Sequence, residues 1–485
     1  MANTVFNPLT SAQEETIHET SIRILEEVGI KVTSKSVLSM LKEHGADLDE
    51  RTEIAKLPEH LVIEALSKAP REFKMCGRDK AYDLALPADR PQGVNDGQPT
   101  YMWDIDEQRK RSSTARDLVD IAIVCDAMPE VDLFWPQVVA TDLPPEVSNC
   151  HEFVASLFFT GKHVQHGSGN ARDTKFLIDA AAAIVGSEKE LARRTIVSIT
   201  HTPLTPLRYE AGDIDAAVEF AKVGLPVVHL SMAISGSVAP VSLAGTVTLV
   251  NAENLAGAVI SELSAPGAPI LYSSESGPMD MRSGVFLSGS TEGSLINAAG
   301  CQMARRYGLP SQVGGIAGSG CRPGFEIGYQ KAISGLIPAM AGADQVVGIG
   351  GFERSGCESL EQIIMDCELW RNVRRAWKGV DVNESTIAFD AIARVGPGGY
   401  FMKDPHTLKH FRSEILLPEI ATLSAEVDSN VEPMNAAAIK KAKRLLAEHR
   451  CNEVEPEIKK NVLELLREYD ESLVSGGVST DYLNR

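Results

Sequence analysis

The 485-residue chain lacks most of the short motifs by which enzyme active sites are commonly found in a sequence. It has no C-x-x-C pair, no H-E-x-x-H, no G-x-S-x-G and no Walker loop, and "GGIAGSG" at 314–320 does not fit G-x-G-x-x-G. Its histidines also give no zinc-site spacing, since "HVQH" would place His163 and His166 on opposite faces of a strand. We therefore expect no metal and no cofactor bound tightly by this chain.

The chain also has no excess of positive charge. With 47 basic and 66 acidic residues the formal net charge is −19, which argues against a general nucleic-acid binder. The eight cysteines are scattered, which is typical of reduced, buried thiols. The first residues, "MANTVFNPLTSAQEET", lack the basic start and apolar stretch of a signal peptide, so we expect a cytoplasmic protein.

One long apolar run, Gly236–Ile260, raises the question of a membrane span. Glu253 and two neighbouring asparagines in its second half would be costly near the middle of a bilayer. A soluble core helix from Ser242 to about Leu263 fits better. A short β-branched run, Leu225–Ser231, precedes it, so the unit is strand, loop, helix.

Units of this kind recur along the chain and predict the fold class. We expect strands at 92–96, 131–135, 162–167, 195–200, 226–231, 269–274, 311–316 and 345–350, each followed by a helical segment. Eight such units predict an α/β protein with a (β/α)₈ TIM barrel at 91–376. A doubly wound sheet is the alternative. We expect residues 1–90 to form an N-terminal helical extension with a hairpin, and residues 377–485 to form a C-terminal helical tail.

The segments before and after the predicted barrel also allow structural predictions. Ser11 with Glu14 fits a capping box for the first helix, and "REFKMCGRDKAYDLALP" predicts a hairpin with a Gly-Arg-Asp turn. The two tail helices have apolar stripes that we expect to join subunits in a homo-oligomer, formed by Leu445, Leu446, Ile458, Val462 and Leu465.

In a TIM barrel the site lies where the strands end, in the loops that follow them. This rule selects rings, acids and glycines that suit an organic cation, because ring faces and carboxylates both attract ammonium groups. The candidate catalytic residues are His166, His201 and Glu353. The candidate substrate-binding residues are Asp96, Tyr101, Trp103, Tyr272, Glu275, Gly314, Gly315 and Phe352, and the rule also selects Trp135.

Several stretches resemble the trimethylamine methyltransferase family. They are Ala233–Gly277, the "GRD" turn at 77–79, "IGYQKAISGLIPAMAGAD" at 327–344 and "GPGGYFMKDPHTLKHFR" at 396–412. The resemblance implies a (β/α)₈ barrel in a multimeric enzyme. It also implies that a methyl group moves from an amine to the Co(I) corrinoid (cobalamin) of a separate cognate corrinoid protein.

The founding enzymes of that family carry pyrrolysine on the strand-seven side of the site, whereas "PSQVGGIAGSGC" at 310–321 holds only ordinary residues. The resemblance therefore implies the branch that acts on small quaternary amines, with glycine betaine as the first candidate. Two other hypotheses stay open. One is a different TIM-barrel enzyme of the lyase or aldolase type, and the other is a non-catalytic betaine-binding subunit.

Overall fold

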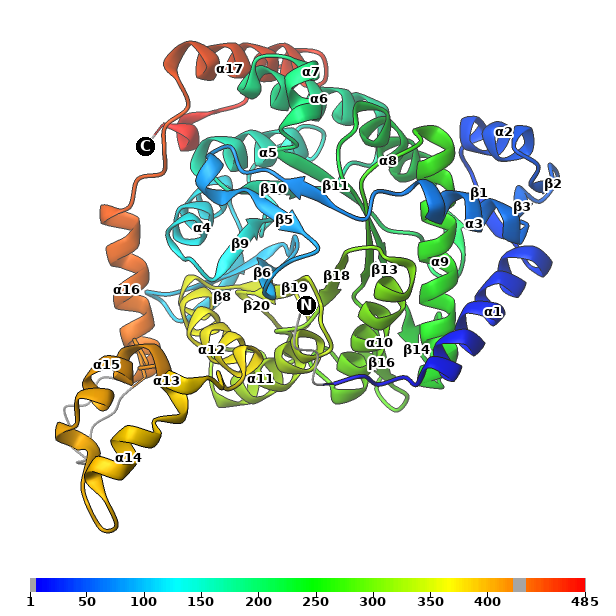
Figure 1. The fold of residues 1–485 in the computed structure, drawn as a ribbon. Helices are drawn as coiled ribbons and strands as arrows, with labels where there is room; N and C mark the ends of the chain where they lie inside the picture. The colour runs from blue at the N-terminus through cyan, green and yellow to red at the C-terminus, as the bar shows by residue number, and fades with distance from the viewer. Residues whose placement is uncertain (1–5, 422–432, 485) are drawn as a thin grey trace.

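The computed structural model describes residues 6–421 and 433–484, and a closed barrel of eight parallel strands lies at its centre (Figure 1). The barrel closes where the last strand pairs with the first, with Val346 opposite Gly93. The predicted (β/α)₈ fold is confirmed, and the doubly wound alternative is wrong. The strands are β6 Gln92–Asn95, β9 Val131–Phe134, β10 His163–His166, β11 Val197–His201, β13 Val227–Ser231, β15 Ile270–Ser274, β18 Ser311–Gly314 and β19 Gln345–Ile349.

Helices surround the barrel and join successive strands. Each of the eight helical segments predicted after the strands contains a helix. The fourth segment, predicted at about 207–222, forms a helix only from Ala211, because Arg208–Tyr209 forms the short strand β12. These helices are α4 Ala115–Ala127, α5 Ser148–Phe159, α6 Ala171–Val185, α8 Ala211–Val223, α9 Leu243–Ser264, α10 Thr291–Tyr307, α11 Phe325–Met340 and α12 Leu360–Lys378, with the short α7 Glu188–Arg193 after α6.

Helix α9 contains the long apolar run and is a core helix. Its length and hydropathy would suffice for a membrane span, but 83% of its most apolar window is buried inside the structure. The charged residue in the middle of the run has partners: Glu253 accepts hydrogen bonds from the Thr205 hydroxyl (3.0 Å) and the Leu207 N–H (2.9 Å). Ser242 is the N-cap residue as expected, but its side chain makes no capping hydrogen bond.

A hairpin fills the barrel end at which the strands begin. It consists of β4 Phe73–Met75 and β5 Leu84–Leu86, and its apolar side chains join those of Val94, Leu133 and Leu271 inside the barrel. The predicted hairpin is present. The predicted Gly-Arg-Asp turn is only part of a longer connection, residues 76–83, which also includes the 3₁₀-helix Lys80–Tyr82. The opposite end, where the strands finish, is left for a site.

The N-terminal extension packs against α9. It contains α1 Ser11–Glu27, β1 Ile30–Val32, α2 Lys35–Glu43, β2 Asp47–Asp49, β3 Ile54–Lys56 and α3 Glu59–Lys68. The predicted capping box is wrong by one residue. Thr10 and Gln13 fit the same pattern and exchange the two capping hydrogen bonds, instead of Ser11 and Glu14.

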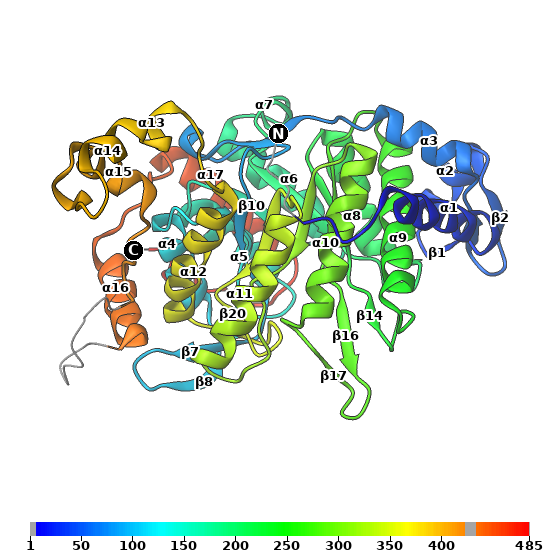
Figure 2. The ribbon, with the colours of Figure 1, turned by 60° about the horizontal axis from the view of Figure 1, so that its bottom comes forward.

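Two small sheets extend beyond the C-terminal ends of the barrel strands, on one side of the molecule in Figure 2. They form because the chain continues into short hairpins after several barrel strands instead of turning directly into a helix. One sheet contains β7 Tyr101–Asp104, β8 Arg109–Ser112, β20 Gly351–Phe352 and β21 Cys357–Glu358, and the other contains β14 Ile234–Ser235, β16 Gly277–Asp280 and β17 Val285–Phe286.

The C-terminal residues form two different structures. Helices α13 Glu384–Ile387, α14 Phe389–Val395 and α15 Pro405–Glu414 make an arm that projects from the barrel (Figure 1). Helices α16 Met434–Glu448 and α17 Pro456–Glu471 pack on α12 and α6 respectively. The apolar stripes that we expected to join subunits therefore face this chain's own barrel, because Val462 is fully buried and Leu445, Leu446, Ile458 and Leu465 pack against the same core.

Candidate active site

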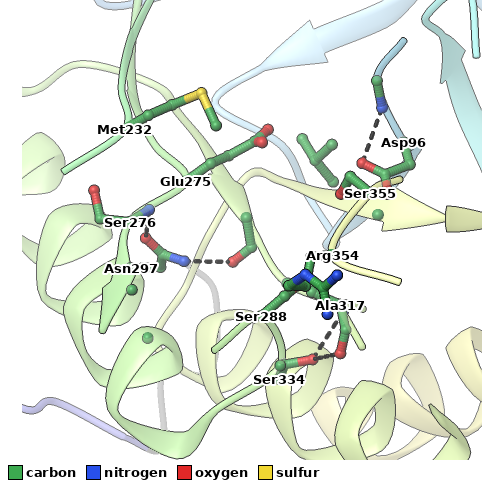
Figure 3. A pocket seen from close by; sticks show the side chains of 18 of the residues that line it. Asp96, Met232, Glu275, Ser276, Ser288, Asn297, Ala317, Ser334, Arg354 and Ser355 are labelled. Atoms are coloured by element: carbon green, nitrogen blue, oxygen red, sulfur yellow. Dashed lines mark hydrogen bonds between the residues drawn. The ribbon is translucent and has the colours of Figure 1, made fainter. Parts of the chain in front are cut away.

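A cavity of about 410 Å³ opens at the C-terminal ends of the barrel strands (Figure 3). Residues at or after the ends of seven of the eight barrel strands contribute to it, as expected for a TIM-barrel site. Its wall includes the predicted residues Asp96, Glu275, Gly314 and Gly315, together with Trp135, Met232, Asn297, Arg354 and Ser355.

Two carboxyl groups, those of Asp96 and Glu275, give the cavity its chemical character. Asp96 follows β6 and Glu275 follows β15, and both side chains line the space between them (Figure 3). Burial, and after it the nearby charge of Asp96, raise the pKa of Glu275 to about 8. One oxygen of Glu275, Oε1, is buried and has no hydrogen-bond partner among the described residues. Such a pair would be stabilised by a cation that enters the cavity.

Asp96 is held in place by its surroundings. Burial raises its pKa, while the charge of Lys331 and hydrogen bonds from Ser355 and the Gly97 N–H lower it. The carboxylate accepts the Gly97 N–H at 2.9 Å. Gly351 passes so close that a Cβ there would lie 1.6 Å from Oδ2 of Asp96. Position 351 therefore requires a glycine for the carboxyl group to occupy this place.

The strand-seven side is shaped by glycines and by an asparagine. Asn297, on α10, donates to the Gly314 carbonyl at 3.0 Å and accepts the Ser276 N–H at 3.1 Å, which ties the loops after β15 and β18 together. A Cβ at Gly314 would lie 3.1 Å from Cγ of Glu275, and one at Gly315 would lie 2.5 Å from Val346. The two glycines therefore make room for Glu275 and for close packing of the loop.

An apolar wall completes the cavity. Trp135 follows β9 and lies in the same interior cluster as Leu230, which also lines the cavity. Trp135 is only 8% exposed, and its indole N–H has no hydrogen-bond partner among the described residues. An aromatic ring beside two carboxyl groups suits an organic ammonium ion.

Four predicted residues lie outside the cavity because the chain continues into hairpins after β6 and β19. Tyr101 is 42% exposed beneath the Lys110 ammonium group. Trp103 and Phe352 contact each other edge to face, with ring centroids 6.3 Å apart. Glu353 pairs with Lys110 at 2.5 Å. These side chains belong to the small sheet and do not line the cavity, in contrast to the prediction that they bind the substrate or take part in catalysis.

Three further predicted residues also lie outside the cavity, because their side chains point from the barrel strands toward the surrounding helices. They are Tyr272, His166 and His201. The Tyr272 hydroxyl donates to Asn251 of α9 at 3.3 Å. His166 packs on Phe153, and burial lowers its pKa to about 4. Burial lowers the pKa of His201 well below its usual value, and its Nδ1 lies 3.1 Å from Nδ1 of His229. Both histidines are neutral groups packed between the barrel and its helices.

Comparison with known proteins decides the family. The sequence profile described as "Trimethylamine methyltransferase (MTTB)" matches residues 2–472. The chain belongs to the trimethylamine methyltransferase family. The trimethylamine methyltransferase MttB of Desulfitobacterium hafniense (strain DSM 10664 / DCB-2) is 33% identical, over 82% of this chain and 80% of that relative. The MttB of Methanosarcina barkeri (strain Fusaro / DSM 804) is 30% identical, over 96% of both chains.

Other similar proteins are named for different methylated amines. The glycine betaine methyltransferase of Desulfitobacterium hafniense (strain Y51) is 29% identical, over 87% of this chain and 88% of that relative. The crystal structure of the monomethylamine methyltransferase MtmB of Methanosarcina barkeri matches with a TM-score of 0.52 at 15% identity, over 90% of this chain and 86% of that chain, and supports the fold. This member of the family is a methyltransferase, so the lyase, aldolase and binding-subunit hypotheses are not supported.

The lysines of this methyltransferase agree with that conclusion. Schiff-base chemistry of the aldolase type needs a lysine in the site, and none of the described residues that line the cavity is a lysine. Lys162 donates to the carbonyl oxygens of Cys125 and Met128 at the other end of the barrel. Lys331 is fully buried in an ion pair with Asp366.

Sequence reasoning missed Asn297, Arg354 and Ser355. Asn297 lies on a helix, where the strand-end rule does not look. Arg354 and Ser355 come directly after the selected Phe352 and Glu353. The Ser355–Gly356 pair is a turn signal, but a turn signal does not show which side chains face the site. Only the observed backbone shows that Arg354 and Ser355 line the cavity.

Proposed function

We propose that this methyltransferase takes a methyl group from a small quaternary amine, with glycine betaine as the first candidate, and delivers it to the reduced corrinoid of a separate partner protein. The observation that carries the proposal is the cavity with Asp96, Glu275 and Trp135 on its wall. Its volume lies within the range of small-molecule sites.

The side chains of this site suit a substrate with a permanent positive charge. A quaternary ammonium ion can be neither protonated nor deprotonated, so its recognition depends on carboxylates and ring faces. When one methyl group leaves, the departing amine is neutral and needs no general acid. Asp96 and Glu275 would therefore bind and orient the cation, and Trp135 would exclude water from it.

The nucleophile would come from outside this chain. Among the described residues of the cavity wall there is no cysteine, histidine or lysine. The reduced corrinoid of a partner protein would supply a strong cobalt nucleophile. Exposed apolar side chains lie on the segments that follow strands β13 and β15. They include Met232 (44% exposed), which lines the cavity, and also Val241 (69%) and Met281 (64%), and they suit contact with such a partner.

The experiment that tests the proposal is methyl transfer to the reduced corrinoid protein, followed by visible absorbance. Glycine betaine, trimethylamine and dimethylglycine are compared at equal concentration with the same partner. We expect transfer from glycine betaine and little from the other two amines. Equal or faster transfer from trimethylamine would contradict the quaternary-amine proposal and leave the family assignment intact.

Binding of the cation is expected to strengthen as the pH rises. Glu275 has a pKa of about 8 in the free protein, and it must be ionised to attract the ammonium group. Affinity at about pH 7 should therefore be about tenfold lower than on the plateau above about pH 9. Calorimetry over this range, with buffers of different ionisation enthalpy, measures the affinity and the proton released. A flat profile, or one that persists in Glu275→Gln, would contradict this role.

The Glu275 carboxyl group is also expected to make the stability of the free protein depend on pH. Its folded pKa of about 8 lies above the ordinary value of 4.5. Ionisation therefore destabilises the free protein progressively as the pH rises between these two values, and the penalty is complete above about 8. A bound cation is expected to remove this penalty.

The arm formed by α13–α15 is expected to contact a second copy of the chain. It exposes large apolar side chains, including Phe389 (74%), Tyr400 (69%) and Leu408 (76%). A patch of this kind on a soluble protein usually marks an interface. The double variant Phe389→Ser/Leu408→Ser should lower the mass measured by light scattering, whereas Val28→Ser, an exposed residue of the N-terminal extension, should not. An unchanged mass in the double variant would contradict the prediction.

A further inference from the structure

The turn between β20 and β21 has an unusual backbone. Glu353, Arg354 and Ser355 have φ values of 54°, 64° and 58°, so three consecutive residues with side chains lie in the left-handed region. Each such residue costs free energy, and runs of them persist only where the surroundings impose them. Here the N–H groups of Glu353 and Arg354 donate to the carbonyls of Gly320 and Gly318, each at 3.0 Å. The loop after strand seven therefore holds the turn in place.

The strained turn places two polar side chains on the cavity wall. Ser355 hydrogen-bonds Asp96, and Arg354 lies beside Ala317 and Ser288 at the open end (Figure 3). Among the residues that the structure describes, the Arg354 guanidinium group has no hydrogen-bond or ion-pair partner. A solvent-exposed arginine without a partner keeps all five N–H donors available for a ligand.

The negative and positive groups of the cavity wall therefore come from different parts of the barrel. Its two carboxyl groups, Asp96 and Glu275, come from strands one and six of the barrel, and its cationic group comes from the turn that follows strand eight. A simple cation would use only the carboxyl groups. A zwitterion would use both, because its own carboxylate would be repelled by Asp96 and Glu275 and attracted by Arg354.

We propose that Arg354 is a specificity-determining residue that binds the carboxylate of the substrate, so that the substrate class is a zwitterionic betaine. This inference rests on the proposed function, since it concerns the other end of the same quaternary amine. The strained turn fixes Arg354 at the open end of the cavity, and the substrate is oriented with its ammonium group toward the two acids. Arg354 does not take part in methyl transfer itself.

Two ligands with the same trimethylammonium group test this proposal. Glycine betaine carries a carboxylate, and choline carries a hydroxymethyl group in its place. Their affinities are measured by calorimetry on the purified full-length chain, with no partner protein present. The variants are Arg354→Gln, Arg354→Lys and the matched control Arg322→Gln, which changes an arginine on a neighbouring loop that does not line the cavity.

Loss of a charge-assisted hydrogen bond predicts that Arg354→Gln binds glycine betaine about tenfold or more weakly, with a change below about twofold for choline. Arg354→Lys should retain part of the preference for glycine betaine, and Arg322→Gln all of it. Equal loss for both ligands, or no loss for glycine betaine, would overturn the assignment of Arg354.

The outcome for Glu275→Gln separates this inference from the proposed function. If Glu275→Gln weakens both ligands while Arg354→Gln changes neither, the quaternary-amine site stands and only the carboxylate contact is wrong. If the unchanged protein binds neither ligand, the proposed function fails and the inference fails with it.

Discussion

Replacement of Glu275 by Gln is expected to lower kcat/KM for glycine betaine by about 100-fold, because a buried cation then loses one of its two charged partners. Removal of one partner of a buried charge pair typically costs about 2–5 kcal/mol. Glu275 is suited to this role because its Oε1 atom is buried and has no partner of its own among the described residues. The assay is methyl transfer at about pH 9, where a carboxyl group with a pKa of about 8 is ionised.

A matched control separates the role in binding from the effect of losing a buried carboxyl group. Glu262, near the end of α9, is also buried, has a pKa raised by burial to about 7 and accepts the Gly267 N–H at 2.7 Å. It does not line the cavity. Glu262→Gln should keep kcat/KM within about twofold of the unchanged enzyme, since distant sites are energetically independent. Equal losses in both variants would show that Glu275 contributes only to the fold.

The sequence was sufficient to predict the barrel because its strands and helices have different patterns. Short β-branched runs such as "LPVVHLS" alternate with longer helical segments, and eight units of this kind leave few topologies. The apolar run of α9 was recognised as a core helix through Glu253, whose charge needs buried partners. The arm and the packing of α16 and α17 could not be predicted, because an amphipathic stripe does not reveal which surface covers it.

The site was predictable only in part, for a reason that applies to parallel barrels generally. Barrel strands are buried on both faces, so apolar residues do not alternate and the sequence does not show which side chains face inward. Tyr272 and His201 were therefore selected although both face the surrounding helices. Asp96 and Glu275 follow their strands directly, and the strand-end rule places such residues at the site.

Replacement of Lys331 by Met is expected to destabilise the protein by about 3 kcal/mol or more, because it leaves a buried charge unpaired. The Lys331 ammonium group lies 2.5 Å from Oδ2 of Asp366, and the two side chains are 0% and 1% exposed. The same aspartate oxygen accepts the Gly350 N–H at 2.7 Å, so the pair supports the segment that leads into β20. Urea denaturation followed by tryptophan fluorescence measures the loss.

The pair Lys175–Asp179 is the matched control, because its atoms lie 2.7 Å apart on an exposed helix surface. Lys175→Met should cost no more than about 0.5 kcal/mol, as is usual for exposed pairs. In Lys331→Met the isolated Asp366 carboxyl would have a raised pKa, so its ionisation penalty falls as the pH falls and the gap to the unchanged protein should narrow at about pH 5.

Lys331 also connects stability to the site, since its charge lowers the pKa of Asp96. Lys331→Met should therefore raise that pKa and weaken cation binding near neutral pH, with recovery at higher pH where Asp96 is ionised again. A stability loss below about 1 kcal/mol, equal to that of an exposed pair, would contradict the buried-pair argument. Unchanged binding of glycine betaine at neutral pH would show that Asp96 does not depend on Lys331 for its charge.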